Sequence, residues 1–280
     1  MQYSILPPPS VLLPALGCHP DTPPILVGGT DIARFGANVS MMYLRLRSRP
    51  RNWIVSFCRW SGTDTYYSAA VITSYLEEVE RAGWILEWFC IDAIGLGAGT
   101  VDALWNSSRR MKDLIRPINV SIPSKAVSPR FRNVRSEIAW NTRQFFRTYS
   151  IAFLNQIWLD KPAVRRVFAD AGFPLTDRTA GRLGIPDWLG SERLREQATT
   201  LLYKADEMSQ SGIQVESKEQ FKLRTEQSSP DEFDALALTL NDRWSGLEDR
   251  KADNRGDFGA QSVAALWQLQ AQMRGSIIGR

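Results

Sequence analysis

The stretch ILVGGTDIARFG, residues 25–36, ends an apolar run on an aspartate, Asp31. Asp92 follows an apolar run in the same way in WFCIDAIGLGAG, and Asp234 lies within an apolar stretch in FDALALTL. A carboxylate beside or within an apolar run costs free energy unless a cation offsets its charge. Three such aspartates, far apart in the sequence, therefore predict one shared site that holds divalent metal ions.

The runs around these aspartates predict the order of strands and helices. Closely spaced apolar or alternating runs indicate three antiparallel strands, in ILVGGTDI, VSMMYLRLR and RNWIVSFCRW. A helical pattern in AVITSYLEEVERAG follows, and the apolar run WILEWFCIDA indicates a fourth, central strand. Further helical patterns then alternate with short strand patterns in IRPINVSI and GIQVESK, up to a last helix in SPDEFDALALTLNDRW.

Three antiparallel strands followed by alternating strands and helices predict an α/β fold, a mixed β-sheet flanked by helices. This element order is the ribonuclease H-like arrangement. Asp31 would end the first strand and Asp92 the fourth. Because these two strands can be neighbours in such a sheet, we expect the two carboxylates to lie close together.

The composition along the chain predicts one domain with two appendages. Residues 1–24 are rich in proline, and we expect an extended leader or linker there. Residues 25–244 form the ribonuclease H-like domain, in which the irregular stretch at about 150–190 is an insertion or a long connection. Residues 245–280 begin polar and end amphipathic, which predicts a linker and a tail helix that docks on another surface.

Composition also argues against several classes of protein. The single histidine, His19, lies in a proline-rich segment, whereas Ser-His-Asp and Cys-His hydrolases need a histidine base on a scaffold. No apolar run is long enough to cross a membrane, and three scattered cysteines fit a reducing cytoplasm. The net charge of +4 and the pI of about 9.0 indicate a mild preference for anionic partners.

Two acids compete for the third position of the predicted site. Ser229, Pro230 and Glu232 form a typical helix start, in which the helix dipole favours any acid at Asp231. A structural role therefore explains Asp231 as well as a catalytic one does. Asp234 lies inside the apolar part of the helix and has no such explanation. We expect Asp234 to be the metal ligand, with Asp231 as an alternative or supporting ligand.

The glycine-rich segment GLGAG, residues 95–99, follows a strand and precedes a helix, as a dinucleotide site would. Residue 100 is Thr, so the spacing GxGxxG is not met, and no acid ends the next strand. We therefore expect a tight turn beside Asp92 that leaves room for a phosphate backbone.

Several basic side chains are candidates for phosphate contacts. A cluster in SPRFRNVRSE begins a helix, and it would hold a duplex by its backbone without reading its sequence. A solvated basic face explains the cluster equally well. One arginine follows Asp31 by three residues, and the lysine of VESK would stabilise developing charge or simply be exposed. The predicted DNA-contacting residues are Arg34, Arg130, Arg132, Arg135 and Lys218.

Four blocks of sequence, in this order, resemble the nuclease domain of the large terminase subunits of tailed bacteriophages. The blocks are GGTDIARFG, FCIDAIGLGAGTVDAL, FRNVRSEIAWNTRQFF, and VESKEQFKLR leading into SSPDEFDALALTL, within residues 24–244. The resemblance implies endonucleolytic cutting of concatemeric double-stranded viral DNA with Mg²⁺ or Mn²⁺. It implies metal ligands at Asp31, Asp92 and an acid of the SPDEFDA block. The family often has a further acid after ARFG, where this sequence has Ala37 and Asn38.

The resemblance also implies partners and a location. These are a terminase ATPase domain, the small terminase subunit and the portal, in the host bacterial cytoplasm. No GxxxxGK[ST] motif occurs, so we expect the chain to be one domain of a longer protein or a separate nuclease subunit. Two alternatives stay open: another ribonuclease H-like enzyme, such as a junction resolvase or transposase core, and a non-catalytic DNA-binding or motor-docking module.

Overall fold

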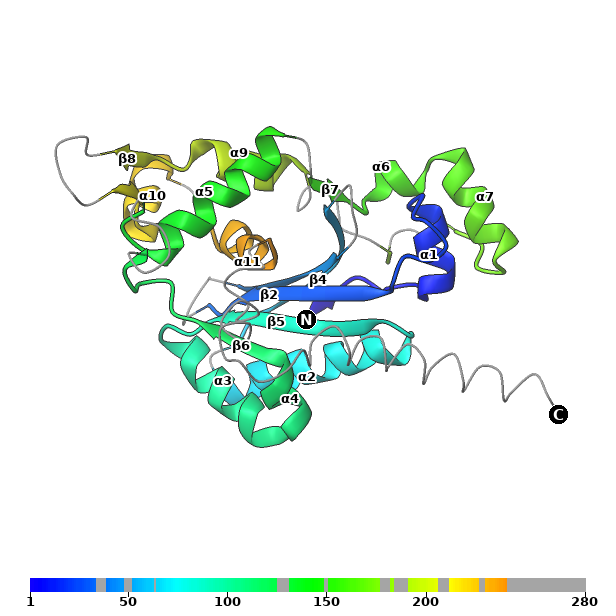
Figure 1. The fold of residues 1–280 in the computed structure, drawn as a ribbon, viewed down its shortest axis with the longest axis horizontal. Helices are drawn as coiled ribbons and strands as arrows, with labels where there is room; N and C mark the ends of the chain where they lie inside the picture. The colour runs from blue at the N-terminus through cyan, green and yellow to red at the C-terminus, as the bar shows by residue number, and fades with distance from the viewer. Residues whose placement is uncertain are drawn as a thin grey trace, which may run out of the picture. The chain divides into compact units, whose positions relative to one another are not determined.

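A mixed β-sheet forms the centre of the computed structural model (Figure 1). Its strand order is β1-β4-β3-β2-β5-β6, and β7 also pairs with β4. The strands β2, β3 and β4 are antiparallel, whereas β5 is parallel to β2 and β6 is parallel to β5. The predicted ribonuclease H-like arrangement is therefore confirmed. The strands are β1 (Gln2–Tyr3), β2 (Ile25–Asp31), β3 (Ser40–Leu46), β4 (Asn52–Trp60), β5 (Ile85–Asp92), β6 (Ile115–Ile118) and β7 (Ile151–Phe153).

The structure describes only part of the chain. Three predictions fall outside it: Arg34, Arg130 and the tail at 245–280. The described residues are 1–33, 39–47, 52–62, 64–124, 131–148, 151–176, 182–183, 191–205, 212–226 and 230–240. None of the helices within these ranges is both long and apolar enough to cross a membrane.

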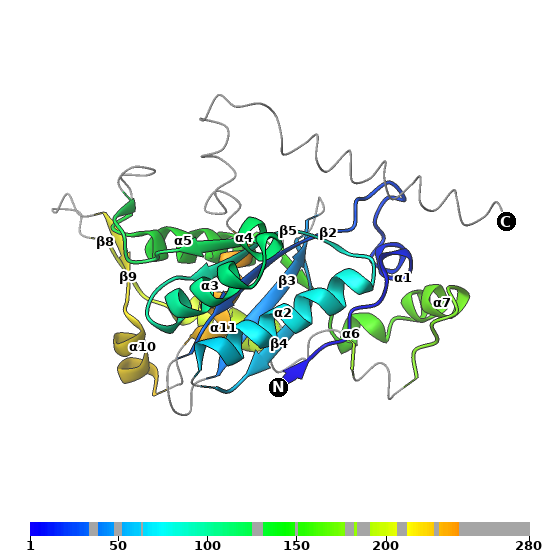
Figure 2. The same cartoon turned by 90° about the horizontal axis from the view of Figure 1, so that it is seen from below.

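Helices cover both faces of the sheet (Figures 1 and 2). One face carries α2 (Thr65–Arg81), α3 (Leu96–Ser107) and α4 (Arg109–Leu114). The other carries α11 (Asp231–Thr239), with α5 (Val134–Arg147) and α9 (Ser191–Thr200) beyond it. The remaining elements are α1 (Pro9–Ala15), α6 (Gln156–Leu159), α7 (Pro162–Asp170), α10 (Lys218–Thr225), and the antiparallel pair β8 (Tyr203–Ala205) and β9 (Ile213–Val215).

The register of β2 and β5 places two of the predicted acids side by side. Thr30 pairs with Ile91 in the parallel ladder, so the next residues, Asp31 and Asp92, end the two strands at the same level. Side chains alternate between the faces of a sheet. Asp31 therefore shares the face of Gly29, which is the face that α11 covers.

The helix α11 lies directly on β2 because Gly29 has no side chain. A Cβ at Gly29 would lie 2.7 Å from the carbonyl oxygen of Ala235 and 2.7 Å from the Cβ of Leu238. Any larger residue would push the helix away from the strand. The close approach brings the acidic first turn of α11 to the end of β2.

The structure corrects one expectation about the less regular parts of the chain. Residues 1–24 are not an extended leader, because β1 pairs with β4 and Leu12 of α1 is fully buried in the core. Proline is tolerated in the first turn of a helix, and Pro9 begins α1. Within the irregular stretch at about 150–190, the described residues include β7, α6 and α7, and Phe168 of α7 is fully buried.

Candidate active site

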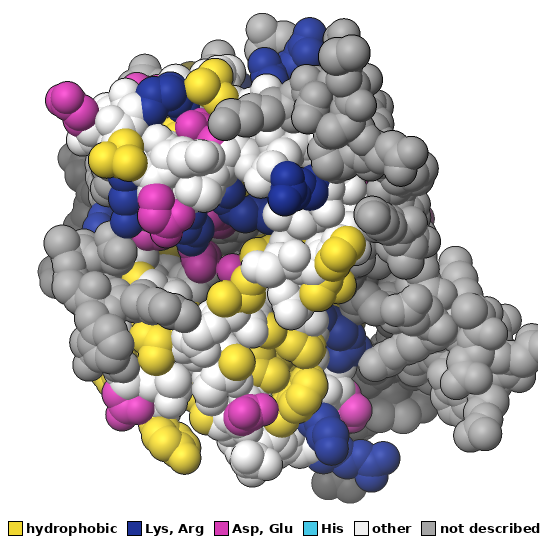
Figure 3. Space-filling view, turned by 90° about the vertical axis from the view of Figure 1, so that its left-hand side faces the viewer, with side chains coloured by type: hydrophobic (Ala, Val, Ile, Leu, Met, Phe, Trp, Pro, Cys, Tyr) yellow, Lys and Arg dark blue, Asp and Glu magenta, His cyan; other side chains and the backbone are white. Residues whose placement is uncertain are grey.

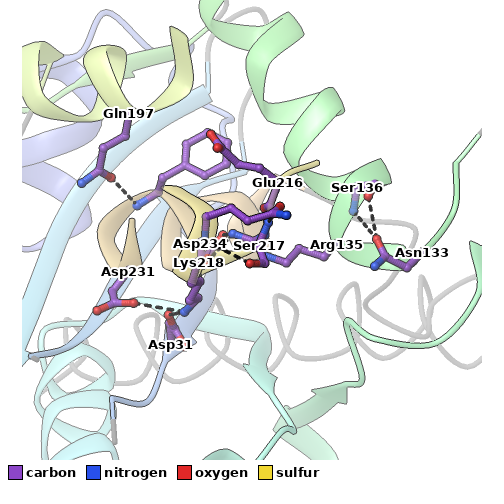
Figure 4. A network of polar contacts seen from close by, with 12 residues as sticks. Asp31, Asn133, Arg135, Ser136, Gln197, Glu216, Ser217, Lys218, Asp231 and Asp234 are labelled. Carbon is purple, nitrogen blue, oxygen red and sulfur yellow. Dashed lines mark hydrogen bonds and ion pairs between the residues drawn. The ribbon is translucent and has the colours of Figure 1, made fainter. Parts of the chain in front are cut away.

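Three carboxylates converge on one ammonium group (Figure 4). The Nζ atom of Lys218 lies 2.5 Å from Oδ2 of Asp31, 3.0 Å from Oδ1 of Asp231 and 3.2 Å from Oδ2 of Asp234. The Asp31 side chain is 7% exposed and that of Lys218 is 29% exposed, so solvent screens these pairs only partly. Both acids that competed for the third position of the site therefore reach the same cation.

Elements far apart in the sequence supply these groups. Asp31 ends β2, and α11 contributes Asp231 and Asp234 from its first turn. Lys218 begins α10, which starts with a capping box in which the Ser217 hydroxyl accepts from the backbone of Gln220. The N-cap of α11 is Pro230, which offers no side-chain cap, and Ser229, for which a capping role was predicted, lies outside the described residues.

The segment before α10 is tied to α5, and this fixes where Lys218 lies. The backbone N–H of Val215 donates to the hydroxyl of Ser136 at 2.9 Å. Nη1 of Arg135 donates to the carbonyl oxygen of Glu216 at 2.6 Å. Two residues later the chain reaches Lys218. The ammonium is thus held opposite the strand ends by contacts that join distant parts of the sequence.

Asp92 completes the group of acids from the neighbouring strand. Its Oδ1 atom is buried and has no hydrogen-bond partner within the described part of the chain. Asp92, Asp234 and Arg135 line one small cavity, together with apolar residues of α5, α11 and the segment after β6. An unpartnered carboxylate oxygen is costly to bury, and a cation in this cavity would satisfy it.

Arg135 is the second cation of the site. Its Nη2 atom lies 3.4 Å from both carboxylate oxygens of Asp234, and both side chains are 15% exposed. Arg135 was predicted to contact DNA, but it lies among the acids. In contrast, Arg132 is exposed and donates to the side chain of Gln214 at 3.1 Å.

Burial and charge shift the pKa values of these groups in opposite directions. Burial raises the pKa of Asp31 to about 7 and that of Asp92 to about 6, and the nearby Lys218 ammonium opposes both shifts. Burial also acts on Asp234, but Arg135 and Lys218 outweigh it and hold its pKa below the usual value. Burial lowers the pKa of Lys218, but Asp31, Asp234 and Asp231 together raise it well above its ordinary value.

These side chains fit a divalent metal ion by their chemistry. Carboxylate oxygens are the ligands that Mg²⁺ and Mn²⁺ prefer. Asp92 offers an unpartnered oxygen, and three other carboxylates already surround a positive charge. With Lys218 between them, no group of three or more acidic, His or Cys side chains in the described ranges is arranged to hold an ion. The donor set therefore fits a metal only if Lys218 moves.

The turn after Asp92 is as tight as its glycines predict. A Cβ at Gly97 would lie 1.8 Å from the carbonyl oxygen of Asp92, so only glycine fits there. Gly95 has a φ of 63°, a conformation that glycine adopts without strain. The tight turn is confirmed, and room for a phosphate backbone stays a prediction.

One contact to the acidic helix has no signal in the sequence. Gln197 of α9 accepts a hydrogen bond from the backbone of Phe233 (Figure 4). Its surroundings, SERLREQATT, have the pattern of an ordinary polar helix.

The space-filling view in Figure 3 shows acidic and basic side chains gathered side by side where this face is hollowed, with hydrophobic side chains next to them.

No family model matches the sequence, and no curated protein matches it. Among solved structures, the nuclease domain of the large terminase subunit gp2 of bacterial virus Sf6 is similar, with 18% identity and a TM-score of 0.47. This similarity covers 81% of this chain and 92% of that chain. The chain is similar to large terminase nuclease domains. The large terminase nuclease from thermophilic phage G20c is 12% identical with a TM-score of 0.45, over 80% of this chain and 84% of that one. A mutant of the Sf6 domain has been solved with manganese, and the G20c nuclease with bound magnesium.

Proposed function

We propose that the chain is a metal-dependent endonuclease that cuts concatemeric double-stranded viral DNA during genome packaging. The observation that carries the proposal is the convergence of four aspartates from β2, β5 and α11. Three of them surround one ammonium, and the fourth has a buried oxygen that no described residue hydrogen-bonds. Acids brought together in this way are typical of functional sites, as are raised pKa values such as those of Asp31 and Asp92.

Asp31, Asp92, Asp231 and Asp234 would hold Mg²⁺ or Mn²⁺, with two ions expected. When bound, such ions activate a water molecule and stabilise the leaving oxygen of a phosphodiester. Asp234 would serve both halves of the site, because it contacts Lys218 and also lines the cavity with Asp92. Arg135 holds the carboxylate of Asp234 in an orientation that serves both.

Lys218 would have two positions. Its ammonium balances the acids before a metal ion arrives, and like charges repel, so it would leave when the ion binds. The backbone before Lys218 is anchored at Glu216 and would stay in place. A rotation of the long Lys218 side chain would then be enough to take the ammonium away from the acids. Turned outward, the ammonium would contact a phosphate of the DNA.

The exposed guanidinium of Arg132 would contact the DNA backbone, and Arg34 and Arg130 are proposed for the same role. Such contacts position a duplex without reading its bases. As partners we propose a terminase ATPase domain, the small terminase subunit and the portal, in the cytoplasm of the bacterial host.

The test is nicking of supercoiled plasmid DNA with Mg²⁺ or Mn²⁺ by the wild type and by Asp92→Ala. A matched control is Asp102→Ala, since Asp102 is an exposed acid of α3 that does not line the cavity of Asp92. We expect Asp102→Ala to cut like the wild type and Asp92→Ala to lose activity. Equal cutting by all three would refute the proposal.

Two further measurements separate the proposed function from the alternatives. Preferential cutting of four-way junctions over linear duplex would favour a junction resolvase. DNA binding without any Mn²⁺ binding in calorimetry would favour a non-catalytic module. The first outcome keeps the metal site and changes the substrate, whereas the second removes both metal and reaction.

A further inference from the structure

We infer that Gln197 is a positioning residue for Asp231 and Asp234, because it holds the first turn of α11 from outside the helix. The inference rests on the proposed metal-dependent function. Gln197 belongs to α9 and is 3% exposed. Within the described part of the chain, its side chain hydrogen-bonds to Phe233 and Glu232 and to none of the four acids, so its effect on them passes through the helix (Figure 4).

The Gln197 amide makes two hydrogen bonds to the first turn of α11. Its Oε1 atom accepts from the backbone N–H of Phe233 at 3.0 Å, and its Nε2 atom donates to Oε2 of Glu232 at 3.1 Å. The first N–H groups of a helix have no acceptor within the helix. Pro230 supplies no side-chain cap, and Gln197 takes over that role from another element.

The other parts of α11 are held just as closely. At its C-terminal end, the buried Arg45 of β3 donates from Nε to the carbonyl oxygen of Thr239 at 2.6 Å. In the middle, the helix lies against the backbone of Gly29. These two contacts fix the helix on the strand, and Gln197 fixes the end that carries the acids. Asp31 sits on the strand itself, so the alignment of the two elements sets the distances between carboxylates.

The length of α11 makes this external hold necessary. The helix spans nine residues, Asp231–Thr239, and isolated helices of this length are marginal in water. The first turn of such a helix frays unless something caps it. Fraying there would move Asp231 and Asp234 together away from Asp31, whereas ligand distances in a metal site must hold to within about 0.2 Å.

The experiment compares Mn²⁺ binding of the full chain and its variants by calorimetry with amide hydrogen exchange of α11. Gln197→Met keeps the length and packing of the side chain but removes both hydrogen bonds. We expect Mn²⁺ affinity to fall about tenfold or more, as for other residues that orient metal ligands. We also expect faster exchange of the Phe233 amide, with little change in the helices on the opposite face of the sheet.

A matched control separates positioning from a general loss of stability. Asn155→Ala removes another buried side-chain cap, in which Asn155 accepts from the backbone of Trp158 at 3.1 Å in the segment before α6. We expect this variant to keep the Mn²⁺ affinity of the wild type. A loss equal to that of Gln197→Met would overturn the inference.

An exchange of partners provides a rescue. Gln197→Glu alone places a second carboxylate against that of Glu232. Because the two negative charges repel, Mn²⁺ binding should weaken. The carboxylate of Gln197→Glu still accepts from the Phe233 amide, and adding Glu232→Gln supplies a donor opposite it, so the affinity should recover. Wild-type affinity in Gln197→Met, or unchanged exchange of the Phe233 amide, would overturn the inference. If the wild type itself binds no Mn²⁺, the proposed function fails, and the exchange data still decide whether Gln197 holds the helix.

Discussion

Gly29→Ala should separate the geometry of the site from the stability of the fold. The added Cβ would lie 2.7 Å from the carbonyl oxygen of Ala235 and 2.9 Å from the backbone nitrogen of Thr239. Ordinary contact begins at about 3.4 Å, so α11 must move outward by about 0.7 Å. That shift is several times the roughly 0.2 Å within which ligand distances of a metal site must hold.

Both consequences can be measured on the same protein. Overpacking of this kind costs roughly 1–3 kcal/mol of unfolding free energy. Because Asp231 and Asp234 move with α11 while Asp31 stays on β2, Mn²⁺ affinity should fall by about 10- to 100-fold. Calorimetry gives the affinity, and urea unfolding without metal gives the stability.

The control for Gly29→Ala is a variant with a similar loss of stability on the other side of the sheet. Val79 of α2 is 2% exposed, and Val79→Ala should cost roughly 1–3 kcal/mol by leaving a cavity. It should leave Mn²⁺ affinity unchanged. The reasoning is refuted if Gly29→Ala binds Mn²⁺ as the wild type does, or if Val79→Ala weakens binding equally.

Three further predictions concern single groups of the site and its surroundings. Lys218→Ala leaves three acids facing one another, so thermal unfolding without metal should occur at a lower temperature, and added Mn²⁺ should restore more stability than it adds to the wild type. Asp92→Asn removes a buried charge whose pKa is raised to about 6, so at pH 8 it should raise the unfolding temperature while abolishing nicking. Burial raises the pKa of Glu216, but hydrogen bonds from Arg224 and the Leu202 backbone outweigh it and lower the pKa below 4.5. Its stabilising effect relative to Glu216→Gln should therefore be complete above pH 4.5 and disappear as the pH falls further, in urea titrations at several pH values.

The central sheet could be predicted from the sequence because its signals are local. Each strand from β2 to β5 is a compact apolar or alternating run, and the acids Asp31 and Asp92 interrupt the ends of two of them. The glycines of the turn at 95–99 also have a local cause, since Gly97 touches the preceding backbone. Such features follow from neighbouring residues and need no knowledge of distant contacts.

The parts that could not be predicted depend on distant contacts. The proline content of residues 1–24 suggested a leader, but Trp84 donates from its indole to the carbonyl oxygen of Pro7 and holds that segment on the core. Lys218 looked like an exposed lysine after a strand. Its place among the acids follows from the contacts of Arg135 and Ser136 with the chain before it, and no local pattern encodes them.

The two cations of the site differ in exposure and in how firmly they are held. Four carboxylates face Lys218 and Arg135, so the described side chains supply half of the positive charge that the acids require when ionised. The guanidinium of Arg135 is tied to Asp234 and to the backbone of Glu216, which holds it in place. Lys218 is the more exposed of the two and carries its charge on a long, rotatable chain, so it can leave. Under the proposed function, a divalent ion that replaced it would bring twice its charge to the same oxygens. The Arg135 guanidinium favours the ionised form of Asp234, and under the proposed function the Lys218 ammonium would stabilise the acids before a metal ion binds and then turn away.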